Sequence, residues 1–174
     1  GFWSHAYAGE LALAIPTDTM SSRLTELRSE MADYPAELSR SLVTRLWEAG
    51  FSAANAKKAI PKLDVAYVAG CLFRSAGVTA HALHGHSHRW LINEKGAIAS
   101  AAALPAAGPS FAQRVADAFE FSDVRRDPLH QNGRRLQRTS FLRANRNLKL
   151  RLIINRQEIF TDEHKERSNT DHDQ

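Results

Sequence analysis

Four histidines lie within eight residues of one another: His81, His84, His86 and His88. Neutral imidazole nitrogens are common ligands of Zn²⁺, so this spacing raises a metal site as one interpretation. No cysteine lies nearby, however, and the surrounding Ala, Gly and Ser residues offer few groups to orient metal-bound imidazoles. We therefore interpret HGHSHRW (84–90) as a polar connection that follows the helix carrying His81, and we predict no metal site.

A second candidate pair consists of Arg74 and His81, with six residues between them. On a helix this spacing puts both side chains on one face. An imidazole can transfer a proton and a guanidinium can balance phosphate charge. The R-x6-H spacing resembles the motif of HEPN-type ribonucleases, helical bundles in which this pair acts on RNA within a dimer. That resemblance implies an alternative function, a HEPN-like module that binds nucleotides or cleaves RNA.

The polar faces of two predicted helices could also meet around a ligand. One face carries Arg45, Glu48, Ser52 and Asn55, and the other carries Tyr67, Cys71, Arg74, Val78 and His81. The simpler interpretation, which we favour, is a solvated surface with one interhelical ion pair between Glu48 and Arg74.

These residues need helices to position them, and hydrophobic periodicity predicts about five. The predicted helices cover about residues 20–33, 35–58, 63–84, 93–104 and a segment that Ser110 caps. We expect Asn93 to cap the fourth helix. Residues 8–15 resemble a short strand that Pro16 ends. The predicted fold is mainly α, a bundle of about five helices with a short N-terminal strand and a poorly ordered C-terminal tail.

The same periodicity predicts which side chains are buried. On the second helix the predicted apolar stripe is Leu38, Leu42, Leu46, Trp47 and Phe51, and on the third it is Val65, Val68, Ala69, Leu72, Ala76, Ala80 and Leu83. The first helix carries a stripe of Met20, Leu24, Leu27 and Met31. We expect each stripe to face the core.

Composition sets the broad class of protein. The hydrophobic fraction of 43% and the charged fraction of 24% are ordinary for a soluble domain. No apolar run approaches the roughly 20 residues of a membrane-spanning helix, so we expect no membrane partner. Cys71 is the single cysteine, which excludes an internal disulfide and favours a cytoplasmic location.

The net charge of +4 belongs to the C-terminal part of the chain. Residues 121–174 contain 12 Lys and Arg against 8 Asp and Glu. Residues 134–156 contain eight basic residues and no acidic one. Such a segment can make weak contacts with nucleic acid through charge alone. We expect residues 122–174 to form a basic, partly disordered tail.

Three long segments together resemble a known family. They are WEAGFSAANAKKA (47–59), DVAYVAGCLFRSAGVTAHALHGH (64–86) and RWLINEKGAIASAAALP (89–105). They are similar to the C-terminal helical region of actinobacterial nucleotidyltransferase-domain proteins, relatives of the aminoglycoside-type nucleotidyltransferases. The resemblance covers about residues 8–120, and its most specific pieces are YVAGCLFR (67–74) and LINEKGA (91–97).

This resemblance implies a parent protein of two parts. Its N-terminal catalytic half would hold Mg²⁺ and a nucleoside triphosphate, and its helical half would close the cleft. Residues 1–16 would then be a leftover strand of the catalytic sheet, and residues 17–121 the helical bundle. The residues that match the family pattern, and would line the substrate side, are Glu48, Asn55, Lys58, Arg74, Asn93, Glu94 and Lys95.

The sequence departs from the family at the metal site. It contains no Gly-Ser pair, and its D-x-D pair, Asp171 and Asp173, lies in the polar tail. We therefore expect no catalytic residues and no cofactor in this chain alone, with Mg²⁺ and a nucleoside triphosphate expected only for the intact parent. The expected partner is an N-terminal catalytic domain or a second copy of the chain.

Overall fold

The computed structural model describes residues 3–15, 17, 22–62 and 64–119. The helices in these residues are α1 (Ala6–Leu13), α2 (Ser22–Glu30), α3 (Ala36–Thr44), α4 (Trp47–Ala59), α5 (Val65–His86), α6 (Ala97–Ala102) and α7 (Phe111–Phe119), with 3₁₀ turns η1 (Ile60–Lys62) and η2 (Pro105–Ala107). No strand occurs among them. The mainly α prediction is confirmed. The predicted tail, residues 122–174, lies outside the described residues.

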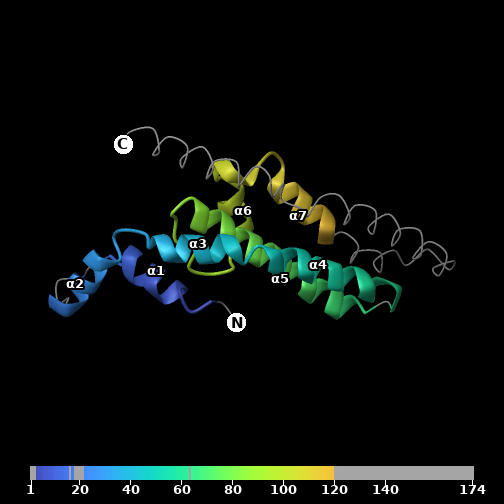
Figure 1. Ribbon diagram of the computed structural model, residues 1–174, viewed down its shortest axis with the longest axis horizontal. Helices are drawn as coiled ribbons and strands as arrows, with labels where there is room; N and C mark the ends of the chain where they lie inside the picture. The colour runs from blue at the N-terminus through green and yellow to red at the C-terminus, as the bar shows by residue number, and fades with distance from the viewer. Residues whose placement is uncertain (1–2, 16, 18–21, 63, 120–174) are drawn as a thin grey trace, which may run out of the picture.

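Helix α5 is the longest described helix and the centre of the arrangement. Helices α3 and α4 follow one another along it, and α6 and α7 pack against it as well (Figure 1). Helix α1 lies beside α3 in this view, and α2 extends the molecule at that end. The long axis of the molecule therefore follows α3, α4 and α5.

The predicted strand at residues 8–15 is wrong, because residues 8–13 belong to α1 and no residue of the segment is in a strand. Its Ala, Leu and Glu residues are strong helix formers. A strand here would need a neighbouring strand to pair its backbone hydrogen bonds, and the described residues contain none. Gly9 lets α1 approach the chain after α5 closely. A Cβ at Gly9 would lie 3.0 Å from side-chain atoms of Trp90 and Ile92. The N-terminal segment is thus a helix seated on the bundle and not a leftover strand.

The predicted second helix is divided into α3 and α4 by a turn at Arg45 and Leu46. Its predicted stripe is only partly correct. Leu42 is buried, but Trp47 and Phe51 are each 58% exposed. The face of α4 that packs against α5 instead consists of Ala49, Ser52, Ala56 and Ala59. Small side chains on this face let the two helix axes approach more closely than aromatic rings would.

The predictions for α5 are largely confirmed. Val68, Leu72 and Leu83 are almost fully buried, together with Ala76 and Ala80. The Asp64 carboxylate accepts a hydrogen bond from the Tyr67 backbone amide at 3.1 Å and so caps the helix. The helix continues to His86, so part of the histidine segment is helical and not a loop.

Two other predicted helices form with differences. Helix α2 has no buried residue among those described, so its predicted stripe does not face a core. Helix α6 begins at Ala97 and not at Asn93. The Asn93 side chain accepts a hydrogen bond from the Lys95 amide at 2.9 Å, which forms a turn, and Gly96 then takes φ 72°. That left-handed conformation favours glycine and delays the start of the helix.

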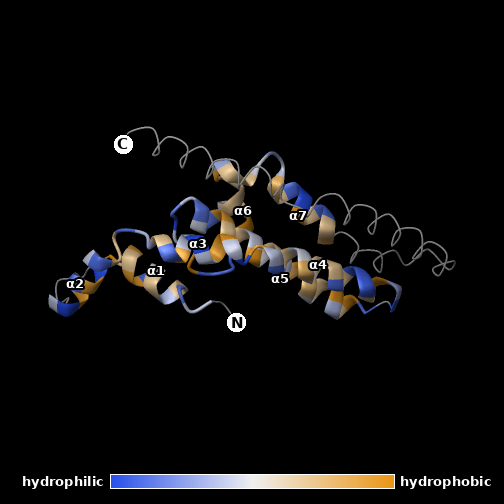
Figure 2. Ribbon diagram, viewed as in Figure 1, coloured by the Kyte–Doolittle hydropathy of each residue, from blue (hydrophilic) through white to orange (hydrophobic). Residues whose placement is uncertain are grey.

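The core is made mostly of small residues. Among the described residues, eleven of the twenty buried hydrophobic residues are alanines. One buried cluster joins α5 to α6, η2 and α7 through residues such as Leu83, Ala101 and Phe111. A second joins α4, η1 and α5 around Val68 and Leu72. Figure 2 shows the apolar residues on α5 and α6 where these two helices meet. The core is therefore held by close helix contact more than by large side chains.

Candidate functional site

The predicted ion pair between Glu48 and Arg74 is confirmed. The Arg74 Nε and Nη2 atoms lie 2.8 Å and 2.6 Å from Glu48 Oε1, and both donate to it. The Glu48 side chain is 23% exposed and the Arg74 side chain is 43% exposed. Because both nitrogens donate to one oxygen, the pair fixes the Arg74 guanidinium beside α4.

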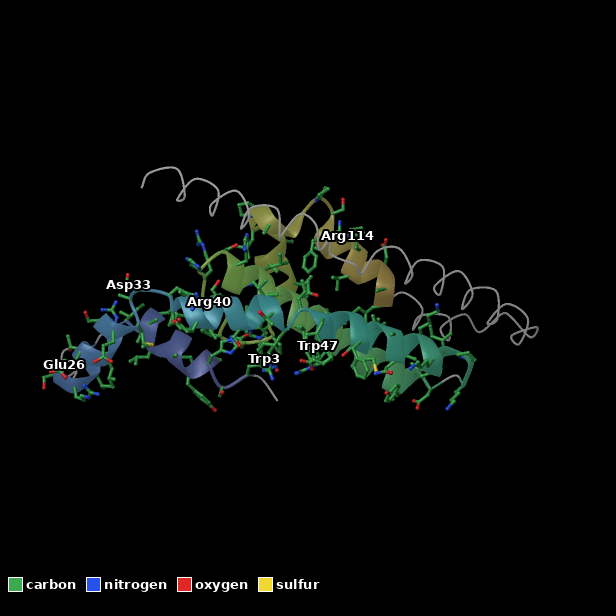
Figure 3. All side chains as sticks on the ribbon, in the orientation of Figure 1. Trp3, Glu26, Asp33, Arg40, Trp47 and Arg114 are labelled. Carbon is green, nitrogen blue, oxygen red and sulfur yellow. The ribbon has the colours of Figure 1, made fainter. Side chains whose placement is uncertain are left out.

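Trp3 joins the two members of the predicted Arg74 and His81 pair. Its ring stacks on His81 with a centroid distance of 4.6 Å and an interplanar angle of 10°. The Arg74 guanidinium carbon lies 5.3 Å from the Trp3 centroid, and that of Arg45 lies at 5.7 Å. Figure 3 places Trp3 near the middle of the molecule, beside α3. Sequence reasoning missed Trp3 because it precedes the first periodic segment.

His5 completes this cluster. Its Nε2 lies 3.2 Å from His81 Nδ1, and the two rings meet edge to face. Burial lowers the pKa of His81 to about 4, and the neighbouring His5, His84 and Arg74 add to this effect. Burial also lowers the pKa of His5. At neutral pH both rings are therefore uncharged, and one donates a hydrogen bond to the other.

A pocket opens beside Arg74 between α5, α6 and α7. We call it the aromatic pocket, and its volume is about 120 Å³. Its wall includes Trp3, Phe73 and Phe119, and its charged groups are Arg74 and Glu94. The remaining lining residues are Ala76, Gly77, Val78, His81, Leu91, Ala97, Ile98 and Val115. Among its described lining residues the pocket is thus mainly apolar, with one cation and one carboxylate.

The structure brings only some of the predicted site residues together. Arg74 and Glu94 line the aromatic pocket, and Glu48 joins them through its ion pair. Asn93 and Lys95 lie in the exposed turn before α6. Asn55 and Lys58 lie 7 and 10 residues beyond Glu48 on α4, which is about 10 to 15 Å along a helix. These two residues therefore belong to another part of the surface.

The four clustered histidines have separate surroundings. His81 contacts Trp3 and His5, whereas His88 stacks on Tyr34 at 5.7 Å. The His84 ring contacts the Ala80 carbonyl. Within the described ranges, no three or more His, Cys, Asp or Glu side chains gather as metal ligands would.

A larger groove lies at the C-terminal end of α5, and we call it the α5–α6 groove. Its volume is about 1020 Å³. The groove is lined by Leu13, His84, His86, Ser87, Arg89, Trp90, Ser100, Ala103, Leu104, Pro105, Ala106 and Gly108. Sequence reasoning did not find it, because α1, α5, α6 and η2 form it only when packed.

A serine and a histidine are hydrogen-bonded in this groove. His84 Nδ1 lies 2.8 Å from the Ala80 carbonyl oxygen, and His84 Nε2 lies 2.9 Å from Ser100 Oγ. A carbonyl oxygen can only accept, so Nδ1 carries the proton. Burial lowers the pKa of His84, and the positive charge of Arg89 lowers it further. The hydrogen bond to the Ala80 carbonyl raises the pKa but does not outweigh burial. The neutral ring therefore accepts the Ser100 hydroxyl proton at Nε2.

Comparison with protein families, with characterised proteins and with solved structures found no match to this chain. The resemblance to nucleotidyltransferase-domain proteins therefore stays a prediction. None of the helices in the described residues is long and apolar enough to cross a lipid bilayer.

Proposed function

We propose that this chain is the substrate-side helical domain of a nucleotidyltransferase-type protein. In this proposal it holds part of a small acceptor molecule in the aromatic pocket and transfers no nucleotide by itself. The observation that carries the proposal is that Arg74 and Glu94 line the same pocket. Both residues match the family pattern, yet they lie 20 positions apart in the sequence.

The size of the aromatic pocket limits what it can hold. A cavity of about 150 Å³ accommodates a benzene molecule, and the volume here is about 120 Å³. The pocket therefore suits one ring-sized group and is too small for a nucleoside triphosphate. This supports a role on the acceptor side of a reaction and not on the nucleotide side.

The charges of the pocket favour a hydroxyl- or amine-bearing ring. An exposed aromatic face such as that of Phe73 attracts ammonium groups. Glu48 is paired with Arg74, whereas Glu94 lies exposed at the start of the turn before α6. Glu94 is thus the carboxylate that can bind an acceptor amine or accept a proton from an acceptor hydroxyl.

Isothermal titration with two ligands tests this proposal. Glucosamine, an amine- and hydroxyl-bearing ring, should bind the purified chain, and Glu94→Gln should weaken the binding about tenfold. Glu37→Gln, which changes an exposed carboxylate on α3, should leave it unchanged. ATP should show no Mg²⁺-dependent binding. Tight Mg²⁺-dependent binding of ATP, or equal glucosamine affinity in the Glu94 variant, would contradict the proposal.

The HEPN-like ribonuclease stays a second candidate because Arg74 and His81 share one face of α5 and both contact Trp3. His81 is only 3% exposed, however, and Arg74 is bound to Glu48. RNA could reach this pair only if residues 3–5 moved aside. Cleavage of a fluorescent single-stranded RNA that His81→Ala abolishes would favour this candidate, and no cleavage by the wild-type chain would exclude it.

A further inference from the structure

The hydrogen bond between Ser100 and His84 has the arrangement of an activated nucleophile. In such sites a serine hydroxyl donates to a neutral imidazole, and a third group holds the other ring nitrogen. Here the Ala80 carbonyl takes the third role, at 2.8 Å from Nδ1. The Ser100 hydroxyl lies 2.9 Å from Nε2, within hydrogen-bond reach of the base.

The surroundings of the two residues differ in a way that suits this role. His84 is 2% exposed, so its ring is held in place by the packing of α5 against α6. Ser100 is exposed and lines the α5–α6 groove. A substrate in the groove can therefore meet the serine oxygen while the base remains fixed behind it. From this geometry we infer that Ser100 is a nucleophile, with His84 as its general base, for ester substrates that carry a negative charge.

The groove indicates the class of substrate. Its volume of about 1020 Å³ accommodates a whole small molecule. Arg89 and His86 line it, and no Asp or Glu is among the lining residues that the structure describes. Trp90, Leu13 and Leu104 provide apolar wall. An acyl ester with a carboxylate or phosphate group therefore matches the groove better than a neutral or cationic ester.

The reaction consists of two transfers. Ser100 Oγ attacks the ester carbonyl carbon, and its proton passes to His84 Nε2. The bond between that carbon and the leaving oxygen breaks, and the departing alcohol takes the proton from His84. Water then attacks the acyl-serine, gives a proton to His84 and releases the carboxylic acid. The proton returns to Ser100, so the side chains end as they began.

Covalent labelling of the full chain tests the inference. A phosphonyl fluoride reagent should add one adduct per chain, which peptide mass spectrometry should locate at Ser100. Ser41 is an exposed serine on α3 and is not among the groove-lining residues, so Ser41→Ala is the matched control. Ser100→Ala should abolish labelling, and Ser41→Ala should not change it. No adduct, or an adduct that persists in Ser100→Ala, would overturn the inference.

Two further measurements separate catalysis from structure. His84→Gln should lower the labelling rate at least about 100-fold. Because that variant can lose stability, the wild-type rate is also measured against pH. The rate should be level near pH 7 and should fall once the pH is below 6.5, as His84 becomes protonated. The charged or titratable groups near His84 are Arg89, His86 and His81. A rate that rises in proportion to hydroxide over this range would show an unactivated serine and overturn the inference.

The charge preference is tested by hydrolysis. The wild-type chain should hydrolyse the p-nitrophenyl monoester of succinate, which bears a carboxylate, faster than p-nitrophenyl acetate. Arg89→Gln should lower the rate for the succinate ester toward that for the acetate ester and so remove this preference. Equal rates for both esters in the wild-type chain would contradict the proposed substrate class.

Discussion

Acidification is expected to destabilise this protein through His81. The folded chain lowers the pKa of this residue from 6.5 to about 4. Between these values the unfolded chain binds a proton that the folded chain excludes. The contribution of His81 to the free energy of unfolding is therefore fully present above pH 6.5 and is lost as the pH falls toward 4. One pKa unit corresponds to about 1.4 kcal/mol, so the loss contributed by His81 between pH 7.5 and 4.5 is about 2.5 kcal/mol.

Urea unfolding at pH 7.5 and 4.5 measures this loss. Burial also lowers the pKa of His5 and of His84, so the comparison is made between variants. His81→Phe keeps a ring beneath Trp3 but cannot bind a proton. It should lose about 2.5 kcal/mol less stability on acidification than the wild-type chain. His88→Gln, at an exposed position, should behave like the wild type.

NMR titration of the histidine rings gives an independent reading of the same residue. The His81 ring should remain uncharged at pH 5.5, where an unperturbed histidine is mostly protonated. A His81 midpoint near 6.5, or equal acid losses in wild type and His81→Phe, would refute the reasoning from burial.

Four further outcomes follow from the packing, the backbone conformation and the ion pair. Leu83→Ala should lower the free energy of unfolding by about 2 to 5 kcal/mol in urea denaturation, because Leu83 is fully buried; a loss below 1 kcal/mol would contradict its place in the core. Gly96→Ala should lower the free energy of unfolding by about 1 kcal/mol, because Gly96 has a φ of 72°. Gly50→Ala should raise it by about 0.5 to 1 kcal/mol in the same assay, because Gly50 lies within α4 and has open space around its Cβ position. Glu48→Gln should cost at most about 1 kcal/mol in thermal unfolding, since its ion pair is partly exposed.

Sequence periodicity predicted α5 well and α4 poorly, and the difference has a physical cause. The buried residues of α5 include large aliphatic side chains such as Leu72 and Leu83, which give a clear 3.6-residue pattern. The buried face of α4 consists of alanines and Ser52, whose signal is weaker than that of the exposed Trp47 and Phe51. The larger side chains therefore indicated the wrong face.

The candidate sites were predictable only where two helices carried opposite charges. Glu48 and Arg74 have complementary charges on predicted helices, and their pairing was expected from the sequence. The contact between Ser100 and His84 depends on the turn at Gly96, because this turn places α6 beside α5. Trp3 belongs to a segment with no periodic signal at all. Such long-range contacts follow from packing, which local patterns do not encode.

The alanine-rich core limits which substitutions this chain can tolerate. A buried alanine loses no side-chain rotamer entropy on folding, so close helix contact forms at little entropic cost. The same closeness leaves no room for growth, and an added methylene in a packed interior costs about 1 to 3 kcal/mol. At positions such as Ala56, Ala80 and Ala101, which are fully buried, almost every replacement is larger. We therefore expect sequence drift to be confined to the outer faces of the helices, while the helix contacts themselves stay nearly fixed.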